Sequence, residues 1–247
     1  GLDLVTVQNP RNPLSESYRA IRTNVMFAMG DRDLRTIVVT SSIPAEGKTT
    51  TACNLAVTLA QAGKRVILVD ADFRRPTLHK IFNRHPNIGL GNLLIGDEPE
   101  RNVLINTDVA NLRVVCSGAT PPNPSEMLGS AAMDRAIEAL KQQADVIILD
   151  TPPVRSVTDA TILSGLADGV VLVVEQGRTG LAAVLRSRDT LSGVRANLLG
   201  IVLNKVSKQS TEDYYYYYYY GDKGKAGSNG AGGVSLPVPA PPAEKVG

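Results

Sequence analysis

A glycine, a lysine and two threonines follow one another shortly after an apolar run, a combination that can bind phosphate. The run Thr36–Thr40 leads into a tight loop that ends Gly47-Lys48-Thr49-Thr50, and a helical pattern follows. Backbone N–H groups at a helix N-terminus can surround a triphosphate, while a lysine reaches its β- and γ-oxygens and a hydroxyl binds Mg²⁺. The candidate contacts in this loop are Ser42, Pro44, Ala45, Glu46, Gly47, Lys48, Thr49 and Thr50.

This loop departs from the usual phosphate-binding pattern at one position. Ser42 stands where the pattern has its first glycine. The alternative interpretation is therefore a helix start that contains Gly-Lys-Thr by chance. The place of the loop, between an expected strand and an expected helix, favours phosphate binding.

Carboxylates end two further apolar runs. Asp70 ends the run Arg65–Asp70 and Asp72 follows it, while Asp150 ends the run Asp145–Asp150. In a parallel sheet these strand ends face the phosphate loop. Carboxylates there can hold Mg²⁺ through its waters, because Mg²⁺ loses its hydration shell reluctantly. The alternative is that Asp70 and Asp150 only cap turns.

The segments that must position these groups are short β-branched runs separated by helical patterns. Their apolar residues are continuous rather than alternating, which indicates strands covered on both faces. The expected strands are Thr36–Thr40, Arg65–Asp70, Leu112–Cys116, Asp145–Asp150, Gly169–Glu175 and Leu198–Asn204. The expected crossover helices are Thr49–Gln61, Met133–Gln143, Thr158–Leu166 and Gly180–Ser192. The sequence predicts an α/β fold with a doubly wound, mostly parallel sheet flanked by helices, whose ligand binds at the carboxyl ends of the strands.

We expect three parts along the 247 residues. Residues 1–14 hold two prolines and are predicted to form an extended N-terminal segment. Residues 15–208 form the main domain, which starts with a helix over Ser15–Met29 that Ser15 can cap. Residues 209–247 have too little aliphatic content to pack, so we expect a disordered C-terminal tail. The tail contains a run of consecutive tyrosines: Tyr214, Tyr215, Tyr216, Tyr217, Tyr218, Tyr219 and Tyr220.

Composition excludes several classes of protein. A net charge of +2 gives no case for binding nucleic acid by bulk electrostatics. Two cysteines and two histidines offer neither a disulfide framework nor zinc spacing, so a reducing cytoplasm is the simplest setting. The apolar runs are far shorter than the roughly 20 residues of a membrane span. The chain starts at Gly1 without Met or a signal-like region, which leaves open that it is cut from a longer one.

The segments Ser42–Thr50, Val66–Pro76 and Ile147–Pro153 resemble the Walker A, A′ and B motifs of the bacterial tyrosine kinases. The resemblance covers roughly residues 4–220 and includes the tyrosine cluster. Related ParA/MinD positioning ATPases carry a second lysine early in the loop, where this chain has Ile43, which argues against that branch. The resemblance implies Mg-ATP as cofactor and domain 15–208 as a tyrosine kinase domain. It also implies that the chain lies at the inner face of the membrane, through a polysaccharide co-polymerase in cis or in trans.

The resemblance also implies roles for single residues. Lys48 would hold the β- and γ-phosphates, and Thr49, Asp72 and Asp150 would hold Mg²⁺. Asp70 would be the base that activates a tyrosine hydroxyl, with a metal-shell role as the alternative. The roles that the resemblance implies for two further residues are less specific. Arg74 would contact phosphate or acceptor, or else form a structural ion pair with a strand-end carboxylate. Asn204 would contact the edge of the nucleotide base, or else make a strand-end hydrogen bond.

The motif Glu16-x-x-Arg19-x-x-Arg22 forms a polar stripe on the expected N-terminal helix. In the family this motif makes contacts between subunits of a ring, whereas the sequence alone favours an ordinary solvated helix face. The ring would bring the tyrosine cluster to a neighbouring subunit's site. The alternatives for the cluster are low complexity and a β-prone adhesive segment.

The resulting hypothesis is an autophosphorylating protein-tyrosine kinase that regulates capsular or exopolysaccharide polymerisation and export through assembly and dissociation of a homo-oligomer. It would also phosphorylate tyrosines of other proteins. The alternatives are a Walker-type ATPase switch or scaffold that leaves its tyrosines unmodified, and a pseudo-enzyme that binds no nucleotide.

Overall fold

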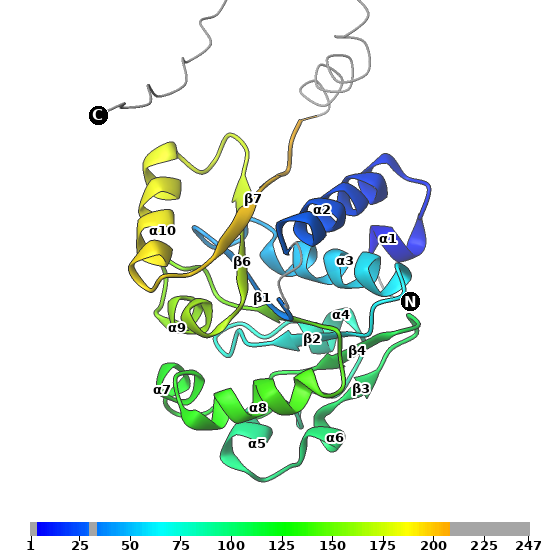
Figure 1. Ribbon diagram of the computed structural model, residues 1–247, viewed down its shortest axis with the longest axis vertical. Helices are drawn as coiled ribbons and strands as arrows, with labels where there is room; N and C mark the ends of the chain where they lie inside the picture. The colour runs from blue at the N-terminus through cyan, green and yellow to red at the C-terminus, as the bar shows by residue number, and fades with distance from the viewer. Residues whose placement is uncertain (1–3, 30–33, 208–247) are drawn as a thin grey trace, which may run out of the picture. The chain divides into compact units, whose positions relative to one another are not determined.

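One mostly parallel sheet organises the chain, and the computed structural model describes residues 4–29 and 34–207 (Figure 1). The strand order in the described residues is β3-β4-β2-β5-β1-β6-β7, and only β3 runs antiparallel to its neighbour. The strands are β1 Thr36–Ser41, β2 Val66–Asp70, β3 Ile105–Asn106, β4 Leu112–Val115, β5 Val146–Asp150, β6 Gly169–Glu175 and β7 Leu198–Asn204. The predicted doubly wound α/β fold is confirmed.

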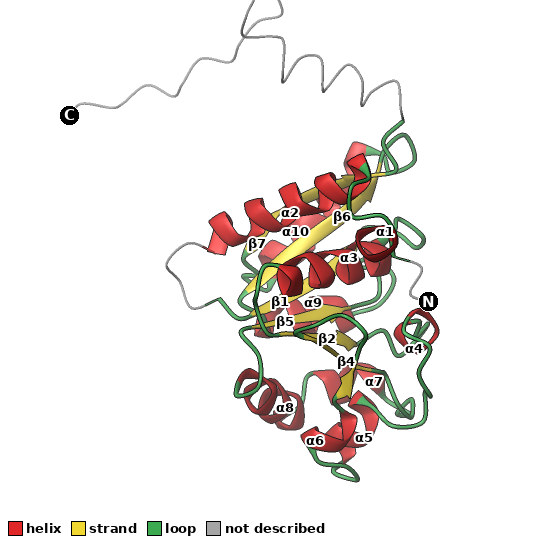
Figure 2. Ribbon diagram, turned by 90° about the vertical axis from the view of Figure 1, so that its right-hand side faces the viewer, coloured by secondary structure: helices red, strands yellow, loops and turns green. Residues whose placement is uncertain are grey.

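Helices cover both faces of this sheet, with α1–α4 on one side and α5–α10 on the other (Figures 1 and 2). Every residue of β1, β2 and β5 is buried, which is why these strands are apolar throughout rather than alternating. The helices are α1 Val5–Gln8, α2 Pro13–Met29, α3 Lys48–Gln61, α4 Leu78–Ile81, α5 Leu90–Ile95, α6 Glu100–Val103, α7 Pro124–Leu128, α8 Ala131–Lys141, α9 Asp159–Leu166 and α10 Leu181–Gly193.

The N-terminal region differs from the expectation in two respects. The extended conformation predicted for residues 1–14 is wrong over Val5–Gln8, which form α1. The helix that follows begins at Pro13 rather than Ser15, and the Asn12 carboxamide accepts the Leu14 N–H at 2.9 Å in the manner of a cap. Ser15 is instead buried inside the helix, and its hydroxyl donates to carbonyls of the preceding segment.

The sheet brings the ends of its central strands together. Asp70 at the end of β2 is the register partner of Asp150 at the end of β5, and β1, which leads into the phosphate loop, pairs with β5 on its other side. Parallel strands present their carboxyl ends at one edge of the sheet, so all three loops start from the same edge.

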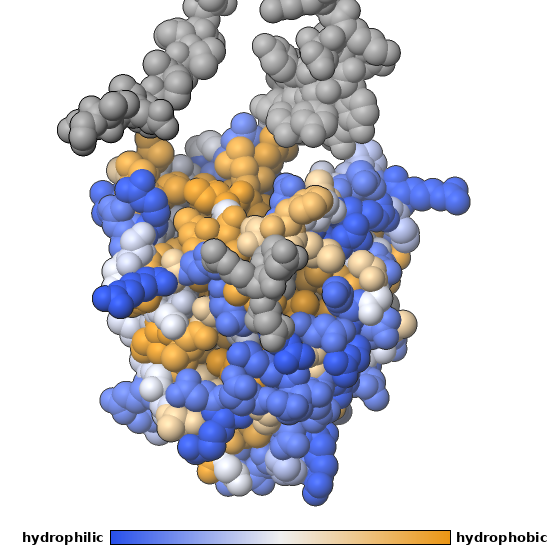
Figure 3. Space-filling view, viewed as in Figure 1, coloured by the Kyte–Doolittle hydropathy of each residue, from blue (hydrophilic) through white to orange (hydrophobic). Residues whose placement is uncertain are grey.

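An apolar surface lies over β7 and the helices α2 and α10 (Figure 3). Its exposed side chains include Phe27, Leu181, Ile201 and Leu203. β7 is the last strand of the sheet among the described residues. No helix in the described part of the chain is long and apolar enough to span a membrane.

Candidate active site

The loop between β1 and α3 is shaped by two left-handed residues. Ala45 has φ of 66° and Gly47 has φ of 91°, so the loop turns sharply before α3 begins at Lys48. A Cβ on Gly47 would lie 2.2 Å from Asn204 Nδ2, so this position has no room for a side chain. A tight loop that ends at a helix N-terminus can direct its N–H groups at an anion.

Lys48 is the centre of the polar cluster at this edge of the sheet. Its Nζ lies 2.8 Å from Asp72 Oδ2, 3.5 Å from Asp150 Oδ1 and 3.2 Å from Thr49 Oγ1. Burial lowers the pKa of Lys48, but the carboxylates of Asp150 and Asp72 outweigh it, so the net pKa is raised and the lysine is charged. The predicted phosphate loop and the two carboxylate strand ends therefore share one site.

Asp150 provides the test of whether this site fits a metal ion. Its carboxylate is fully buried, and Oδ2 accepts a hydrogen bond from Thr49 Oγ1 at 2.7 Å. Oδ1 has no hydrogen-bond partner among the described residues. Burial raises the pKa of Asp150 to about 6, although Lys48 and Thr49 lower it. A buried carboxylate oxygen that accepts no hydrogen bond and has only the Lys48 ammonium at 3.5 Å, beside a hydroxyl and a second carboxylate, fits Mg²⁺ and its waters.

The described residues contain no group of three His, Cys, Asp or Glu side chains arranged to hold a metal by themselves. A magnesium ion in a nucleotide site is bound through one or two carboxylates, and phosphates and water supply most of the other ligands. The donor set at Thr49, Asp72 and Asp150 is of this kind.

Asp70 lies beneath the cluster rather than at its surface. Its Oδ2 accepts the N–H groups of Thr77 and Leu78 at 2.9 and 3.0 Å, and its Oδ1 accepts the Asp72 N–H at 3.3 Å. Burial, together with the charge of Asp150, raises the pKa of Asp70 to about 7. Asp70 thus orders the chain from Asp72 to the start of α4, and its predicted role as a base stays a prediction.

Other residues of the predicted loop direct their side chains into the fold. The buried carboxylate of Glu46 accepts the N–H groups of Ile43 and Glu175 at 2.7 and 3.1 Å, and the Thr179 hydroxyl donates to it as well. Ser42, in place of the expected glycine, is buried and its hydroxyl accepts a bond from the Ser187 hydroxyl at 3.0 Å. These side chains brace the loop, while Pro44, Ala45 and Thr50 are exposed.

Two residues at the end of β7 hold the loop from the other side. Asn204 Nδ2 donates to the Glu46 carbonyl at 2.8 Å, so its predicted contact with a nucleotide base stays a prediction. Lys205 Nζ donates to the Ala45 carbonyl at 2.8 Å and lies 2.9 Å from Glu175 Oε2. The local sequence around Lys205 does not indicate this role, because its partner Ala45 lies 160 residues away along the chain.

Arg74 forms a structural ion pair, but its partner is Asp159 at the start of α9 and not the strand-end carboxylate that was expected. Its guanidinium contacts the buried carboxylate of Asp159 at 3.1 Å and the Ser125 hydroxyl at 3.2 Å. On α2, Arg19 pairs with Glu16 at 2.5 Å, and Arg22 donates to the Thr58 carbonyl at 3.4 Å. The expected acceptors, Tyr214–Tyr220, lie outside the described residues.

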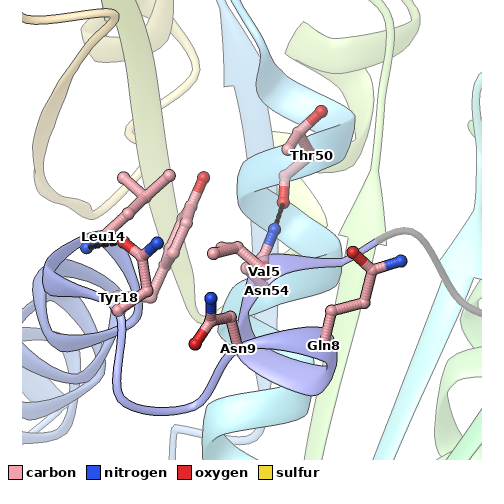
Figure 4. Close-up of a pocket in the computed structure, with 8 residues that line it drawn as sticks. Val5, Gln8, Asn9, Leu14, Tyr18, Thr50 and Asn54 are labelled. Atoms are coloured by element: carbon pink, nitrogen blue, oxygen red, sulfur yellow. Dashed lines mark hydrogen bonds between the residues drawn. The ribbon is translucent and has the colours of Figure 1, made fainter.

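A cavity of about 350 Å³ lies beside the first turn of α3, between that helix, α1 and α2 (Figure 4). Tyr18, Thr50 and Asn54 line it, and Asn54 Nδ2 donates to the Thr50 carbonyl at 2.9 Å. No local sequence pattern indicates this cavity, because its walls come from three separate helices and the segment that joins α1 to α2.

Fold and site together define a P-loop nucleotide-binding protein of the α/β class. A family model described as an AAA domain matches residues 34–199, more than half of the chain. The chain is 40% identical over 215 residues to the tyrosine-protein kinase YwqD of Bacillus subtilis (strain 168), which covers 86% of this chain and 91% of that protein. It is 37% identical over 206 residues to the putative tyrosine-protein kinase CapB of Staphylococcus aureus, with 83% and 90% covered.

A solved structure supports the same assignment. The crystal structure of the chimerical protein CapA2B2 matches with a TM-score of 0.80 at 41% identity, covering 83% of this chain and 90% of that one. This chain belongs to the family of bacterial tyrosine-protein kinases. The resemblance drawn from its three motifs is confirmed.

Proposed function

We propose that this chain transfers the γ-phosphoryl group of Mg-ATP to Tyr214–Tyr220, and that it does so between copies within a ring. The observation that carries the proposal is the position of Lys48, whose Nζ lies within 3.5 Å of carboxylates from both Asp72 and Asp150. Family membership supplies the acceptor class, and the tyrosine run supplies the acceptor in this chain.

Catalysis would consist mainly of positioning and of charge stabilisation. Lys48 would bind the β- and γ-phosphates together with the N–H groups of the loop that includes Gly47. Thr49, Asp72 and Asp150 would hold the magnesium ion, which neutralises phosphate charge. The tyrosine oxygen forms a bond to the γ-phosphorus as the bond to the β–γ bridging oxygen breaks, which leaves ADP, phosphotyrosine and one proton.

Asp70 is the proposed acceptor of that proton. A tyrosine hydroxyl has a pKa near 10, so it is protonated at neutral pH. The pKa of Asp70, about 7, gives it a suitable proton affinity. Because Asp70 is buried, acting as the base requires that the tyrosine hydroxyl reach Oδ1, whose single hydrogen bond, from the Asp72 N–H at 3.3 Å, is the longest of the three that the carboxylate accepts.

The tyrosines are within reach of a site in the same copy or in a neighbouring one. Tyr214 follows Asn204 by ten residues, a span of at most about 35 Å when extended. Seven phosphates would add roughly −10 to −14 charges to a chain whose net charge is +2. Repulsion between such tails would separate the copies, so phosphorylation would act as a dissociation switch.

Helix α2 is the proposed contact between copies. It carries Glu16, Arg19 and Arg22 on one stripe, and the side chain of Phe27 is 80% exposed. Exposed apolar side chains next to charged ones are typical of surfaces that bind another protein.

The cellular role that we propose is regulation of capsular or exopolysaccharide export. A polysaccharide co-polymerase, as a separate chain or as part of a longer one, would activate the kinase and hold it at the inner face of the membrane. This part of the proposal rests on the family resemblance of the three motifs and the tyrosine cluster.

A phosphosite map after incubation with Mg-ATP tests the kinase proposal. Phosphate should appear on Tyr214–Tyr220 in the unaltered chain and be absent from the Lys48→Met variant. Release of free phosphate with unmodified tyrosines would instead support the ATPase switch. Absence of nucleotide binding in a calorimetric titration would support the pseudo-enzyme and refute both.

A further inference from the structure

Three arginines stand on the two loops next to the phosphate loop. Arg74 and Arg75 follow β2, and Arg155 follows β5. These strands are paired in parallel, and their last residues, Asp70 and Asp150, are register partners. The two loops therefore leave the sheet side by side, at the edge where Lys48 lies.

Backbone hydrogen bonds tie both loops to the site. The Arg75 N–H donates to Asp72 Oδ1 at 3.0 Å, and the other oxygen of Asp72 lies 2.8 Å from Lys48 Nζ. The Val154 N–H, one residue before Arg155, donates to the Ser41 carbonyl at 2.9 Å. Ser41 is the last residue of β1, directly before the phosphate loop. Arg75 and Arg155 are thus placed beside the site by its own backbone contacts.

Arg74 differs from the other two because its charge is already neutralised. Its guanidinium is held by Asp159 and Ser125. The side chains of Arg75 and Arg155 are exposed and have no hydrogen-bond or ion-pair partner among the described residues. Two unpaired cations at the edge of a transfer site will attract an anionic ligand.

In the sequence, acidic residues flank the tyrosine cluster that is the proposed acceptor. Glu212 and Asp213 immediately precede Tyr214, and Asp222 follows two residues after Tyr220. Side chains one or two residues from an acceptor tyrosine lie about 3 to 7 Å from it along an extended chain. Acidic side chains flanking the tyrosine in the site would therefore fall within reach of arginines at the edge of that site.

We propose that Arg75 and Arg155 form an acceptor-recognition site that binds the acidic side chains flanking the tyrosine cluster. The ligand class is an acidic tyrosine-containing peptide, and Arg74 with Asp159 supports the loop that presents Arg75. This inference rests on the proposed function, because it concerns the acceptor of the same transfer reaction. The site would select acceptors by charge and bring the tyrosine next to the γ-phosphate.

The test is a mutant cycle in the full chain, with the initial rate of tyrosine phosphorylation as the readout. Arg75→Gln with Arg155→Gln should slow phosphorylation about fivefold, and so should Glu212→Gln with Asp213→Asn. All four changes together should be no slower than either pair, because both pairs remove the same contact. The affinity for ATP, measured by calorimetry, should not change.

Charge reversal and a matched control sharpen the result. Arg75→Glu with Arg155→Glu should slow the reaction further, and Glu212→Lys with Asp213→Lys in the same chain should restore much of the rate. As control, Arg135→Gln with Arg186→Gln removes two equally exposed arginines on α8 and α10 and should leave the rate unchanged.

Three outcomes would overturn the proposal. An unchanged rate in the Arg75 and Arg155 variant would show that these residues do not bind the acceptor peptide. Weakened ATP binding in that variant would assign the arginines to the nucleotide. Additive losses in the four-residue variant would show that the arginines and acids act separately. A failure of the proposed function looks different, because the unaltered chain would then bind ATP and carry no phosphotyrosine.

Discussion

Replacement of Asp70 by Asn should stabilise the folded chain, and by more at pH 8 than at pH 5. The carboxyl is buried beside Asp150, and its pKa is raised from 3.8 to about 7. In the unfolded chain the group ionises near pH 4, so between pH 4 and 7 the folded state binds the extra proton. Stability from this group is therefore greatest at low pH and is lost as the pH rises through about 7.

The size of the effect follows from the same shift. Each pKa unit corresponds to about 1.4 kcal/mol, so the contribution of Asp70 should fall by roughly 3 kcal/mol between pH 5 and pH 8. In Asp70→Asn, one amide oxygen can still accept the Thr77 and Leu78 N–H groups. The amide nitrogen would then face the Asp72 N–H, a mismatch that costs about 1 kcal/mol at every pH. Because part of the loss has already occurred at pH 5, the variant should be less than about 1 kcal/mol more stable at pH 5 and about 3 kcal/mol more stable at pH 8.

Urea unfolding followed by far-ultraviolet circular dichroism, at pH 5, 6, 7 and 8 in EDTA without nucleotide, measures this difference. Asp97→Asn, an exposed position on the turn after α5, serves as the matched control and should show no such dependence on pH. If the difference in unfolding free energy between Asp70→Asn and the unaltered chain were the same at pH 5 and pH 8, the reasoning about Asp70 would be refuted.

Three further predictions concern the loop, the assembly and the core. Lys205→Met should raise the KM for ATP about fivefold with little change in kcat, because the Ala45 carbonyl loses its hydrogen-bond donor. Lys205→Arg should behave like the unaltered chain. An equal KM in both variants would show that the contact between Lys205 and Ala45 does not support the loop. Alanine at Glu16, Arg19 and Arg22 together should shift the mass in light scattering toward the monomer, and an unchanged mass would count against α2 as the interface. Ile147→Ala, in a fully buried position of β5, should lower the unfolding free energy by about 2 to 5 kcal/mol in urea titration, and a loss below 1 kcal/mol would show that the sheet centre is not close-packed.

The central strands β1, β2, β5 and β6 could be predicted because they are covered on both faces. For β7 the expected cover on both faces is wrong, since none of its residues is buried, although its apolar run still predicted a strand. Continuous apolar runs such as Gly169–Glu175 and Leu198–Asn204 have the same bounds in the sequence analysis and in the structure. The two-residue strand Ile105–Asn106 was missed, since so short an antiparallel edge leaves no periodic pattern. The helix start at Pro13 was also missed, because the buried role of Ser15 depends on the carbonyls of a segment folded back against it.

The sequence by itself determined which residues are candidates for a phosphate site, because Gly47-Lys48-Thr49 and the two strand-end aspartates carry chemistry that few other arrangements need. Tertiary structure alone decided the role of their neighbours. Glu46, which the motif offers to the ligand, is directed inward to Glu175 and Thr179, and Lys205 supports the loop from across 160 residues. The physical reason is that a motif specifies chemistry locally, while burial and pairing depend on which distant segments the sheet brings to the same edge.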